Sequence, residues 1–332
     1  MKDMHIHENI LGTIGDTPLV RLNRVTDGVK ASIFAKVESF NPGGSVKDRI
    51  GINIVKDEIA KGKLKPGGTI VECTSGNTGC GLALVAAVMG FKVIFTMPDK
   101  MSQEKVNLLK AYGARVVMCP TNVPADSPES YYSVARRIVE ETPGAITTNQ
   151  YFNPLNPDAH YRTTGPEIWR DTAGRVDYYV AGLGTGGTIS GAGRYLKEQN
   201  PDIKVIGVDT EGSILKHYFY HNEIIEAKPY LVEGIGEDII PGNIHWDWID
   251  EVVTAPDRES FALTRRLCRE EGILAGGSCG SAVYGALEVA RELDSDKIVV
   301  VLLPDTGERY LSKVHSDEWM MENGMMEKTK TS

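Results

Sequence analysis

The sequence predicts an α/β protein in which short apolar strands alternate with amphipathic helices along 332 residues. Strand candidates such as KVIFTM and KIVVVLL are continuous apolar runs, which is typical of parallel strands covered on both faces. Helical patterns long enough to serve as crossover connections separate these runs, as parallel pairing requires. The expected fold is therefore one open, twisted α/β sheet or two such sheets.

The elements follow one another in a regular order. The expected strands are residues 32–38, 68–73, 92–97, 115–119, 177–182, 204–209 and 297–303. The expected helices are residues 46–61, 78–90, 102–112, 130–141, 158–171, 187–199, 257–271 and 281–293. Residues 213–248 are rich in aromatic residues and glycine without clear periodicity, which predicts a long excursion or lid. A polar connection near residues 148–153 predicts a domain boundary.

Composition and charge exclude several classes of protein. A formal net charge of −9 argues against nucleic-acid and membrane partners, because both favour basic surfaces. The five cysteines are odd in number and never spaced C-x-x-C, which predicts a cytoplasmic protein without disulfides or structural zinc. The N-terminus shows no secretory pattern, and His5 and His7 are interpreted as part of a polar terminus rather than as metal ligands.

A glycine-rich loop at residues 182–188 follows an expected strand and opens the next helix. It matches G-x-G-x-x-G, and Asp209 could serve as the ribose-binding acid of a dinucleotide site, although it lies further on than the usual ~20 residues. The hydroxyls of Thr185 and Thr188 favour a terminal phosphate instead, because hydroxyls and N–H groups at a helix start form a compact anion nest. A monophosphate cofactor is favoured, with a nicotinamide dehydrogenase as the alternative.

Lys47 follows the residues NPGGSV at the expected start of a helix. The spacing is not that of a phosphate-binding Walker loop, in which the lysine directly follows G-x-x-x-x-G. A helix N-terminus is a poor place for a surface cation, and its field favours the neutral, nucleophilic amine. Lys47 is therefore predicted to bond covalently to a cofactor, with an ordinary surface lysine as the alternative.

Two further helix starts carry small polar residues. The segment CTSGNTG, residues 73–79, places hydroxyls and N–H groups where the carboxylate of an amino acid binds well. N-capping explains one such residue, but not four polar residues in five positions. The segment GGSCGS, residues 276–281, makes Ser278 a candidate hydrogen-bonding group, with plain capping as the alternative.

The chain contains, in this order, the segments TPLVRLN, NPGGSVKDRIG, TSGNTG, GTGGT and GGSCGS. In combination and in order, these segments resemble the fold-type II, pyridoxal-5′-phosphate-dependent β-family of cysteine synthases and cystathionine β-synthases. The resemblance covers nearly the whole chain. It implies two open, twisted α/β domains of the tryptophan synthase β-like architecture, with the cofactor in the cleft between them. A smaller domain would span residues 41–149, a larger phosphate-binding domain residues 1–40 and 150–322, and a disordered tail residues 323–332.

The same resemblance assigns roles to individual residues. Lys47 would hold pyridoxal 5′-phosphate as an aldimine and act as the catalytic base, and Tyr151 would lie by the leaving group or second substrate. The other cofactor-binding residues would be Asn77 at the 3′ oxygen, Gly184, Thr185, Gly186, Gly187 and Thr188 around the phosphate, Ser278 at the pyridine nitrogen, and Pro304 and Asp305. The substrate-binding residues would be Thr74, Ser75, Gly76, Asn77, Thr78, Gln150 and Gly234.

Segments such as MPDKMSQEKVNLLKAYGA and VEGIGEDIIP resemble the catalytic core of cystathionine β-synthase more than O-acetylserine sulfhydrylase. The implied reaction is β-replacement of L-serine by L-homocysteine through an aminoacrylate, giving L-cystathionine. Ser278 would be a neutral partner for the ring nitrogen, which favours β-elimination over transamination. The alternative within the family is cysteine synthase, acting on O-acetylserine and sulfide, with release of hydrogen sulfide from cysteine as a side activity.

The resemblance further implies a homodimer that binds amino-acid substrates and neither haem nor metal. The sequence shows no counterpart of the tandem regulatory domains of many relatives, so activation by S-adenosylmethionine is not expected. Cys73 stands where the family usually has proline beside the loop at residues 74–78, which could alter that loop. Neither Cys73 nor Cys279 is expected to act as a nucleophile.

Overall fold

The computed structural model describes residues 6–74, 76–99, 101, 103–124 and 126–327. These residues form two compact units, each made of two stretches of chain. The smaller unit combines the described residues of Met1–Gly15 with those of Asn41–Leu155, and the larger unit those of Asp16–Phe40 and Asn156–Ser332. Compared with the expected division, the smaller unit also takes in the N-terminal segment and residues 150–155.

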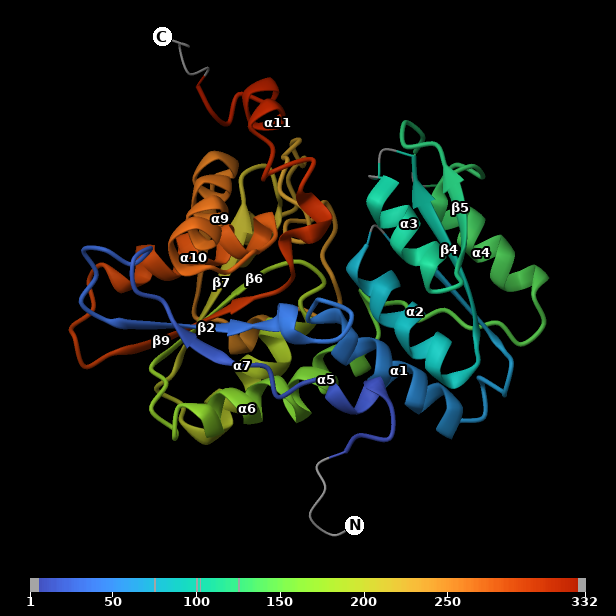
Figure 1. Ribbon diagram of the computed structural model, residues 1–332, viewed down its shortest axis with the longest axis horizontal. Helices are drawn as coiled ribbons and strands as arrows, with labels where there is room; N and C mark the ends of the chain where they lie inside the picture. Colours follow the sequence, from blue (N-terminus) through green and yellow to red (C-terminus); the bar gives the residue numbers. More distant parts are fainter. Residues whose placement is uncertain (1–5, 75, 100, 102, 125, 328–332) are drawn as a thin grey trace. The chain divides into compact units, whose positions relative to one another are not determined.

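The smaller unit is built on a parallel sheet in the spatial order β3-β4-β5. The strands are β3 (Thr69–Cys73), β4 (Lys92–Pro98) and β5 (Arg115–Cys119). The helices are the 3₁₀ helix η1 (Ile10–Thr13) and the α-helices α1 (Lys47–Ala60), α2 (Asn77–Met89), α3 (Gln103–Ala111) and α4 (Tyr131–Glu141). Figure 1 shows α2 and α3 against one face of this sheet and α4 against the other.

Burial in this unit follows the apolar pattern of the sequence. Phe95 and Met97 on one face of β4 and Thr96 on the other are fully buried, because the sheet is covered on both faces. α2 is buried from Thr78 to Ala86, as its apolar sequence requires. The unit therefore has its own core, to which η1 adds Leu11.

The larger unit contains a mixed sheet in the order β1-β2-β9-β6-β7-β8. Its strands are β1 (Leu19–Arg21), β2 (Ser32–Val37), β6 (Tyr178–Gly182), β7 (Lys204–Thr210), β8 (Glu251–Ala255) and β9 (Ile298–Leu303). Only β1 pairs antiparallel among these strands, and it lies at the edge. β9 is paired on both sides, with β2 and β6, which agrees with its continuous apolar sequence IVVVLL.

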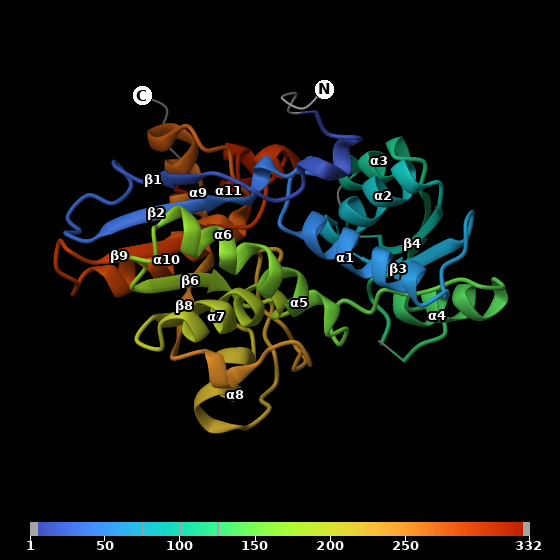
Figure 2. The same ribbon diagram turned by 90° about the horizontal axis from the view of Figure 1, so that it is seen from below.

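Helices cover both faces of the larger sheet (Figures 1 and 2). α9 and α10 pack on one face and α6 and α7 on the other. The helices are α5 (Leu155–Arg162), α6 (Thr164–Asp171), α7 (Gly187–Gln199), α8 (Leu215–His221), α9 (Asp257–Glu271), α10 (Gly277–Ala290) and α11 (Asp317–Glu322), with the 3₁₀ helices η2 (Glu38–Phe40), η3 (Trp246–Trp248) and η4 (Gly307–Tyr310).

Several elements differ from the expectation. The helix expected over residues 158–171 is two helices, because Thr163 leaves the helical conformation and Pro166 has no N–H to donate to the preceding turn. β1, β8, α8 and α11 were not predicted. Within the tail expected at residues 323–332, Met325 and Met326 pack against a core cluster, and residues 328–332 lie outside the described part of the chain.

The carboxyl ends of parallel strands are where open α/β folds place their ligands. In the smaller unit β3 ends at Cys73, directly before the loop at residues 74–78. In the larger unit β6 ends at Gly182, before the glycine-rich loop, and β9 ends at Leu303, before Pro304 and Asp305. Each unit therefore carries one group of the predicted site residues at this end of its sheet.

Candidate active site

Lys47 is the first residue of α1, and a tight turn leads into it. The Gly44 N–H donates to the Asn41 carbonyl over 2.8 Å, and the Gly43 N–H donates to Oδ2 of Asp48 over 2.5 Å. A Cβ on Gly43 would overlap the Asp48 carboxylate, so the turn requires glycine there. These contacts determine where α1 begins and leave Lys47 partly buried at its N-terminus.

α1 and α2 cross at two glycines. A Cβ on Gly81 would lie 2.8 Å from the carbonyl oxygen of Lys47, and a Cβ on Gly51 would lie 3.0 Å from the carbonyl carbon of Gly81. Because neither glycine has a side chain, the two backbones come into direct contact. Asn77 begins α2 one helical turn before Gly81. The structure thus brings the start of α1 close to the start of α2.

The asparagine loop, defined as residues 74–78, runs from the end of β3 into the first turn of α2. Oγ1 of Thr74 accepts the N–H groups of Gly76 and Gly79 over 3.2 and 3.3 Å, which folds the loop over the helix start. Asn77 and Thr78 occupy the first turn of α2, at the positive end of its dipole. Ser75, also predicted to bind substrate, lies outside the described residues. The arrangement suits a small anion.

Glu72 ties the connection before Gln150 to the end of β3, although no motif singled it out. Its Oε2 accepts the N–H groups of Thr148 and Asn149 over 2.9 and 3.1 Å and the Thr148 hydroxyl. Burial raises the pKa of the Glu72 carboxyl, and these hydrogen bonds oppose the rise. Gln150 is thereby held at the asparagine loop, where Thr78 Oγ1 donates to its Oε1 over 2.5 Å.

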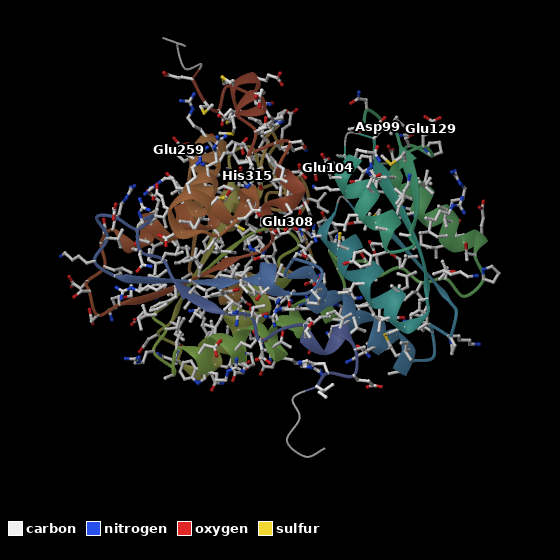
Figure 3. All side chains as sticks on the ribbon, in the orientation of Figure 1. Asp99, Glu104, Glu129, Glu259, Glu308 and His315 are labelled. Atoms are coloured by element: carbon white, nitrogen blue, oxygen red, sulfur yellow. The ribbon has the colours of Figure 1, made fainter. Side chains whose placement is uncertain are left out.

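Lys105 of α3 is a second residue that the motifs missed. It is 4% exposed, and its Cδ, Cε and Nζ lie 3.5, 3.5 and 3.6 Å from the position that a Cβ on Gly76 would take. In contrast to the buried Lys105, three acidic residues of the same unit are exposed: Asp99, Glu104 and Glu129 (Figure 3). A buried positive charge therefore lies beside the asparagine loop.

Tyr151 and Cys73 flank this group of residues. Tyr151 is partly buried in the turn that follows Asn149, whose φ is +47°. Cys73 is the last residue of β3, and burial together with the Glu72 carboxylate raises the pKa of its thiol to about 12. The thiol is therefore protonated near neutral pH, a state in which it is a poor nucleophile.

The glycine-rich loop of the larger unit joins β6 to α7. Gly186, the N-cap residue, has φ +84°, and α7 begins at Gly187. A Cβ on Gly184 would lie 2.7 Å from the Gly234 carbonyl oxygen. A Cβ on Gly186 would overlap Ile244, and a Cβ on Gly187 would overlap Asn156. The backbone thus packs too closely for side chains, and Gly186 leaves the first N–H groups of α7 without a side-chain cap.

Two side chains of α5 hold the hydroxyls of this loop. Asn156 Nδ2 donates to Oγ1 of Thr185 over 3.1 Å, and Nε2 of His160 lies 3.2 Å from Oγ1 of Thr188. Asn156 and His160 are both fully buried. A helix N-terminus, a glycine cradle and two positioned hydroxyls fit a phosphate monoester such as that of pyridoxal phosphate.

Asp209 does not offer the ribose contact of a dinucleotide site. The side chain is fully buried, and burial raises its pKa. Its Oδ1 accepts the Thr210 N–H over 2.9 Å, and its Oδ2 accepts the Lys216 N–H over 2.7 Å at the start of α8. The carboxylate therefore organises the β7–α8 connection. The dehydrogenase alternative is left without the acidic residue that would bind the ribose.

Ser278 is the second residue of α10 and is 3% exposed. Gly234 lies beside it, because a Cβ on Gly234 would be 3.7 Å from Oγ of Ser278. The φ of Gly234 is +90°, which glycine adopts readily. Gly234 thus lies close both to Ser278 and, through its carbonyl, to Gly184 of the glycine-rich loop.

Pro304 and Asp305 follow β9 at the same end of the sheet. Oδ2 of Asp305 accepts the Tyr310 hydroxyl over 2.6 Å, and a Cβ on Gly276 would overlap its Oδ1. Asp305 therefore packs directly against the residue that precedes α10. This contact supports the helix start that carries Ser278.

The predicted site residues fall into two groups. The smaller unit holds Lys47, Thr74, Gly76, Asn77, Thr78, Gln150 and Tyr151, and the larger unit holds Gly184, Thr185, Gly186, Gly187, Thr188, Gly234, Ser278, Pro304 and Asp305. Within the described ranges, no helix has both the length and the hydropathy to cross a bilayer. The same ranges contain no group of three or more His, Cys, Asp and Glu side chains arranged for a metal ion.

Comparisons with known proteins agree with this geometry. Residues 10–305 match the family described as "Pyridoxal-phosphate dependent enzyme". The chain is 48% identical over 324 residues to a cystathionine beta-synthase of Apis mellifera, covering 97% of this chain and 64% of that protein. It is 43% identical over 306 residues to a cysteine synthase of Staphylococcus aureus, covering 92% of this chain and 96% of that protein.

A solved structure shows the same architecture. The crystal structure of an O-ureido-L-serine synthase has a TM-score of 0.87 and 39% sequence identity and covers 98% of both chains. The predicted fold class is therefore confirmed. The chain spans less than two thirds of the length of the cystathionine beta-synthases it matches, at 64% for the Apis mellifera protein and 58% for that of Mus musculus.

Proposed function

Because this chain belongs to the family of pyridoxal-phosphate-dependent enzymes, we propose that it replaces the hydroxyl group of L-serine with a thiol, foremost L-homocysteine. The Cβ–O bond of serine breaks and a Cβ–S bond forms, while the thiol proton leaves with the hydroxyl as water. The product is L-cystathionine. The likeness to cystathionine beta-synthases over almost the whole chain supports this choice of substrates.

The main observation behind the proposal is the buried hydroxyl of Ser278 beside Gly234. When bound, pyridoxal phosphate draws electrons away from the Cα of the amino acid, and a neutral partner at its ring nitrogen limits this effect. In the proposal Ser278 is that partner. Negative charge then remains near Cα, which favours loss of the β-substituent over transamination.

The proposal assigns the other residues to binding and proton transfer. Lys47 Nζ would hold the cofactor covalently and would then remove the α-proton of the substrate, a role that is typically worth about 10²–10⁴-fold in rate. Asn77 would meet the 3′ oxygen of the cofactor, and Tyr151 would lie by the leaving group. The phosphate binds at residues 184–188, near Pro304 and Asp305. The substrate carboxylate binds at Thr74, Ser75, Gly76, Asn77, Thr78 and Gln150, with Gly234 as a wall.

The second candidate function is cysteine synthase. The likeness to a cysteine synthase favours it, because the match covers 96% of the length of that protein. Steady-state rates with L-serine and L-homocysteine, compared with rates on O-acetylserine and sulfide, separate the two candidates. A larger kcat/KM for L-serine and L-homocysteine supports the proposal. A larger kcat/KM for O-acetylserine and sulfide supports cysteine synthase instead, with release of hydrogen sulfide from cysteine as a side activity.

We further propose a cytoplasmic homodimer that binds neither haem nor metal. Native mass spectrometry of the holoenzyme checks the subunit number, and elemental analysis checks for iron and zinc. A monomer, or stoichiometric iron or zinc, would contradict this part of the proposal.

A further inference from the structure

We propose that the ion pair between Lys313 and Glu233 positions the site, because it holds residues 233–236 in place so that Gly234 stays beside Ser278. The role of Gly234 as a substrate wall rests on the proposed function. That the ion pair holds Gly234 beside Ser278 concerns residues of the larger unit alone. Lys313 lies on the segment between η4 and α11, and Glu233 directly precedes Gly234.

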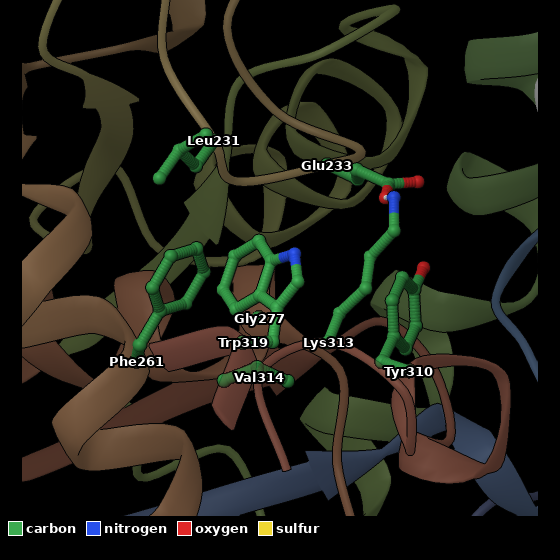
Figure 4. A pocket seen from close by; sticks show the side chains of 8 residues that line it. All are labelled: Leu231, Glu233, Phe261, Gly277, Tyr310, Lys313, Val314 and Trp319. Carbon is green, nitrogen blue, oxygen red and sulfur yellow. Dashed lines mark hydrogen bonds and ion pairs between the residues drawn. The ribbon is translucent and has the colours of Figure 1, made fainter. Parts of the chain in front are cut away.

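The ion pair is close and partly shielded from solvent. Nζ of Lys313 lies 2.5 Å from Oε1 of Glu233, with side-chain exposures of 28% and 23%. Figure 4 shows the pair at one end of a small pocket. The other residues that line the pocket are Leu231, Phe261, Gly277, Tyr310, Val314 and Trp319. This largely apolar lining limits the screening that weakens fully exposed pairs.

The chain on either side of Glu233 is anchored by backbone contacts. Upstream, the N–H groups of Leu231 and Val232 donate to Asp257 over 2.6 and 3.0 Å. Downstream, the Gly236 N–H donates to the Leu183 carbonyl over 2.7 Å. Gly234 itself lies between these anchors. The ion pair of Glu233 therefore acts at the part of the segment nearest to Ser278.

This part of the segment depends on side-chain anchoring because it is rich in glycine. Gly234 and Gly236 have φ values of +90° and +77°, and glycine has more conformational freedom than any other residue. Apart from its own chain neighbours, a Cβ on Gly234 would have only Oγ of Ser278 within 4 Å among the described atoms. Loss of the Lys313 charge is therefore expected to let Gly234 move away from Ser278 and from the Gly184 backbone.

Hydrogen–deuterium exchange of the holoenzyme measures this effect directly. In Lys313→Met, which keeps an unbranched side chain but removes the charge, the amides of residues 231–236 should exchange about fivefold faster, the effect of losing a pair worth ~1 kcal/mol. Lys313→Arg should restore slow exchange, and Glu233→Gln should reproduce the Met variant. Lys197→Met, which removes the 2.8 Å pair with Asp250, serves as the matched control.

Kinetics supply the second measurement. Lys313→Met should raise the KM for the amino-acid substrate about fivefold, with pyridoxal phosphate content unchanged and Lys313→Arg restoring the wild-type value. Unchanged exchange at residues 231–236 in both Lys313→Met and Glu233→Gln would overturn the inference. Faster exchange in an enzyme that turns over neither substrate pair would support the ion-pair role and count against the proposed function alone.

Discussion

The carbonyl oxygen of Lys47 is in contact with the backbone of Gly81, lying 2.8 Å from the position that a Cβ on Gly81 would take. The contact joins the first residue of α1 to the second turn of α2, the helix that Asn77 begins. The residue proposed as base is therefore positioned by a glycine of another helix. A side chain at residue 81 would push the two helix starts apart.

Gly81→Ala should lower kcat by roughly 10²-fold, because displacing a reactive group by about 1 Å can have that effect. The same substitution should lower the free energy of unfolding by about 1–3 kcal/mol through overpacking. Steady-state kinetics and urea unfolding measure the two effects. Ala87→Gly, on the exposed end of α2, is the control, and should lower stability by about 1 kcal/mol without changing kcat. Wild-type kcat in Gly81→Ala would contradict the proposed positioning.

Lys105→Met should weaken binding of the amino-acid substrate, because it removes a buried positive charge beside the asparagine loop. The expected rise in KM is about tenfold, which corresponds to ~1.4 kcal/mol of charge interaction. Equilibrium titration with L-serine, measured by calorimetry, gives the change in Kd independently of turnover. Lys110→Met on the exposed face of α3 should leave the affinity unchanged. Equal affinities for the wild type and Lys105→Met would exclude Lys105 from the substrate site.

Glu72→Gln should change how stability depends on pH. Burial places the folded-state pKa of Glu72 above its unfolded value of about 4.3, so folding favours the protonated carboxyl. Its stabilising contribution is complete below the unfolded pKa and is lost as pH rises through the raised pKa. The glutamine variant has no such titration. Urea unfolding between pH 4 and 8 should therefore show the wild type losing stability relative to Glu72→Gln as pH rises, and a constant difference would argue against a raised pKa.

Cys73 should resist alkylation in the folded enzyme. The pKa of its thiol is raised to about 12 by burial and by Glu72, so very little thiolate exists at pH 8. Burial also raises the pKa of Cys279, well above its ordinary range. Iodoacetamide followed by peptide mass spectrometry should modify Cys268 first. Modification of Cys73 as fast as Cys268 would show that the thiol near the asparagine loop is reactive.

Strong local signals made most of the fold predictable from the sequence. The helices at residues 187–199 and 257–271 were predicted with the bounds that α7 and α9 have, because turn and capping residues mark their ends. β1 and β8 were missed, since a three-residue strand and the short run EVVTA show little apolar periodicity. The break between α5 and α6 depends on Pro166, which a periodic pattern alone conceals.

The residues of the candidate site were also predicted only in part. Motifs around Lys47, Asn77 and Ser278 were recognisable because each lies within a few residues of a helix start. The supporting residues Glu72, Lys105, Asn156 and His160 were not predicted, because they act on parts of the chain distant in sequence. Glu72, for example, accepts a hydrogen bond from a residue 76 positions away, and such pairings depend on the folded topology.

The covalent role of Lys47 is the central claim, and borohydride reduction tests it most directly. The purified holoenzyme should be yellow, and reduction should abolish its visible band and leave the cofactor fixed to one peptide. Tandem mass spectrometry should place the added mass on Nζ of Lys47, and Lys47→Ala should fold but show neither the fixed mass nor turnover. Attachment at another lysine, or wild-type turnover by Lys47→Ala, would contradict the account.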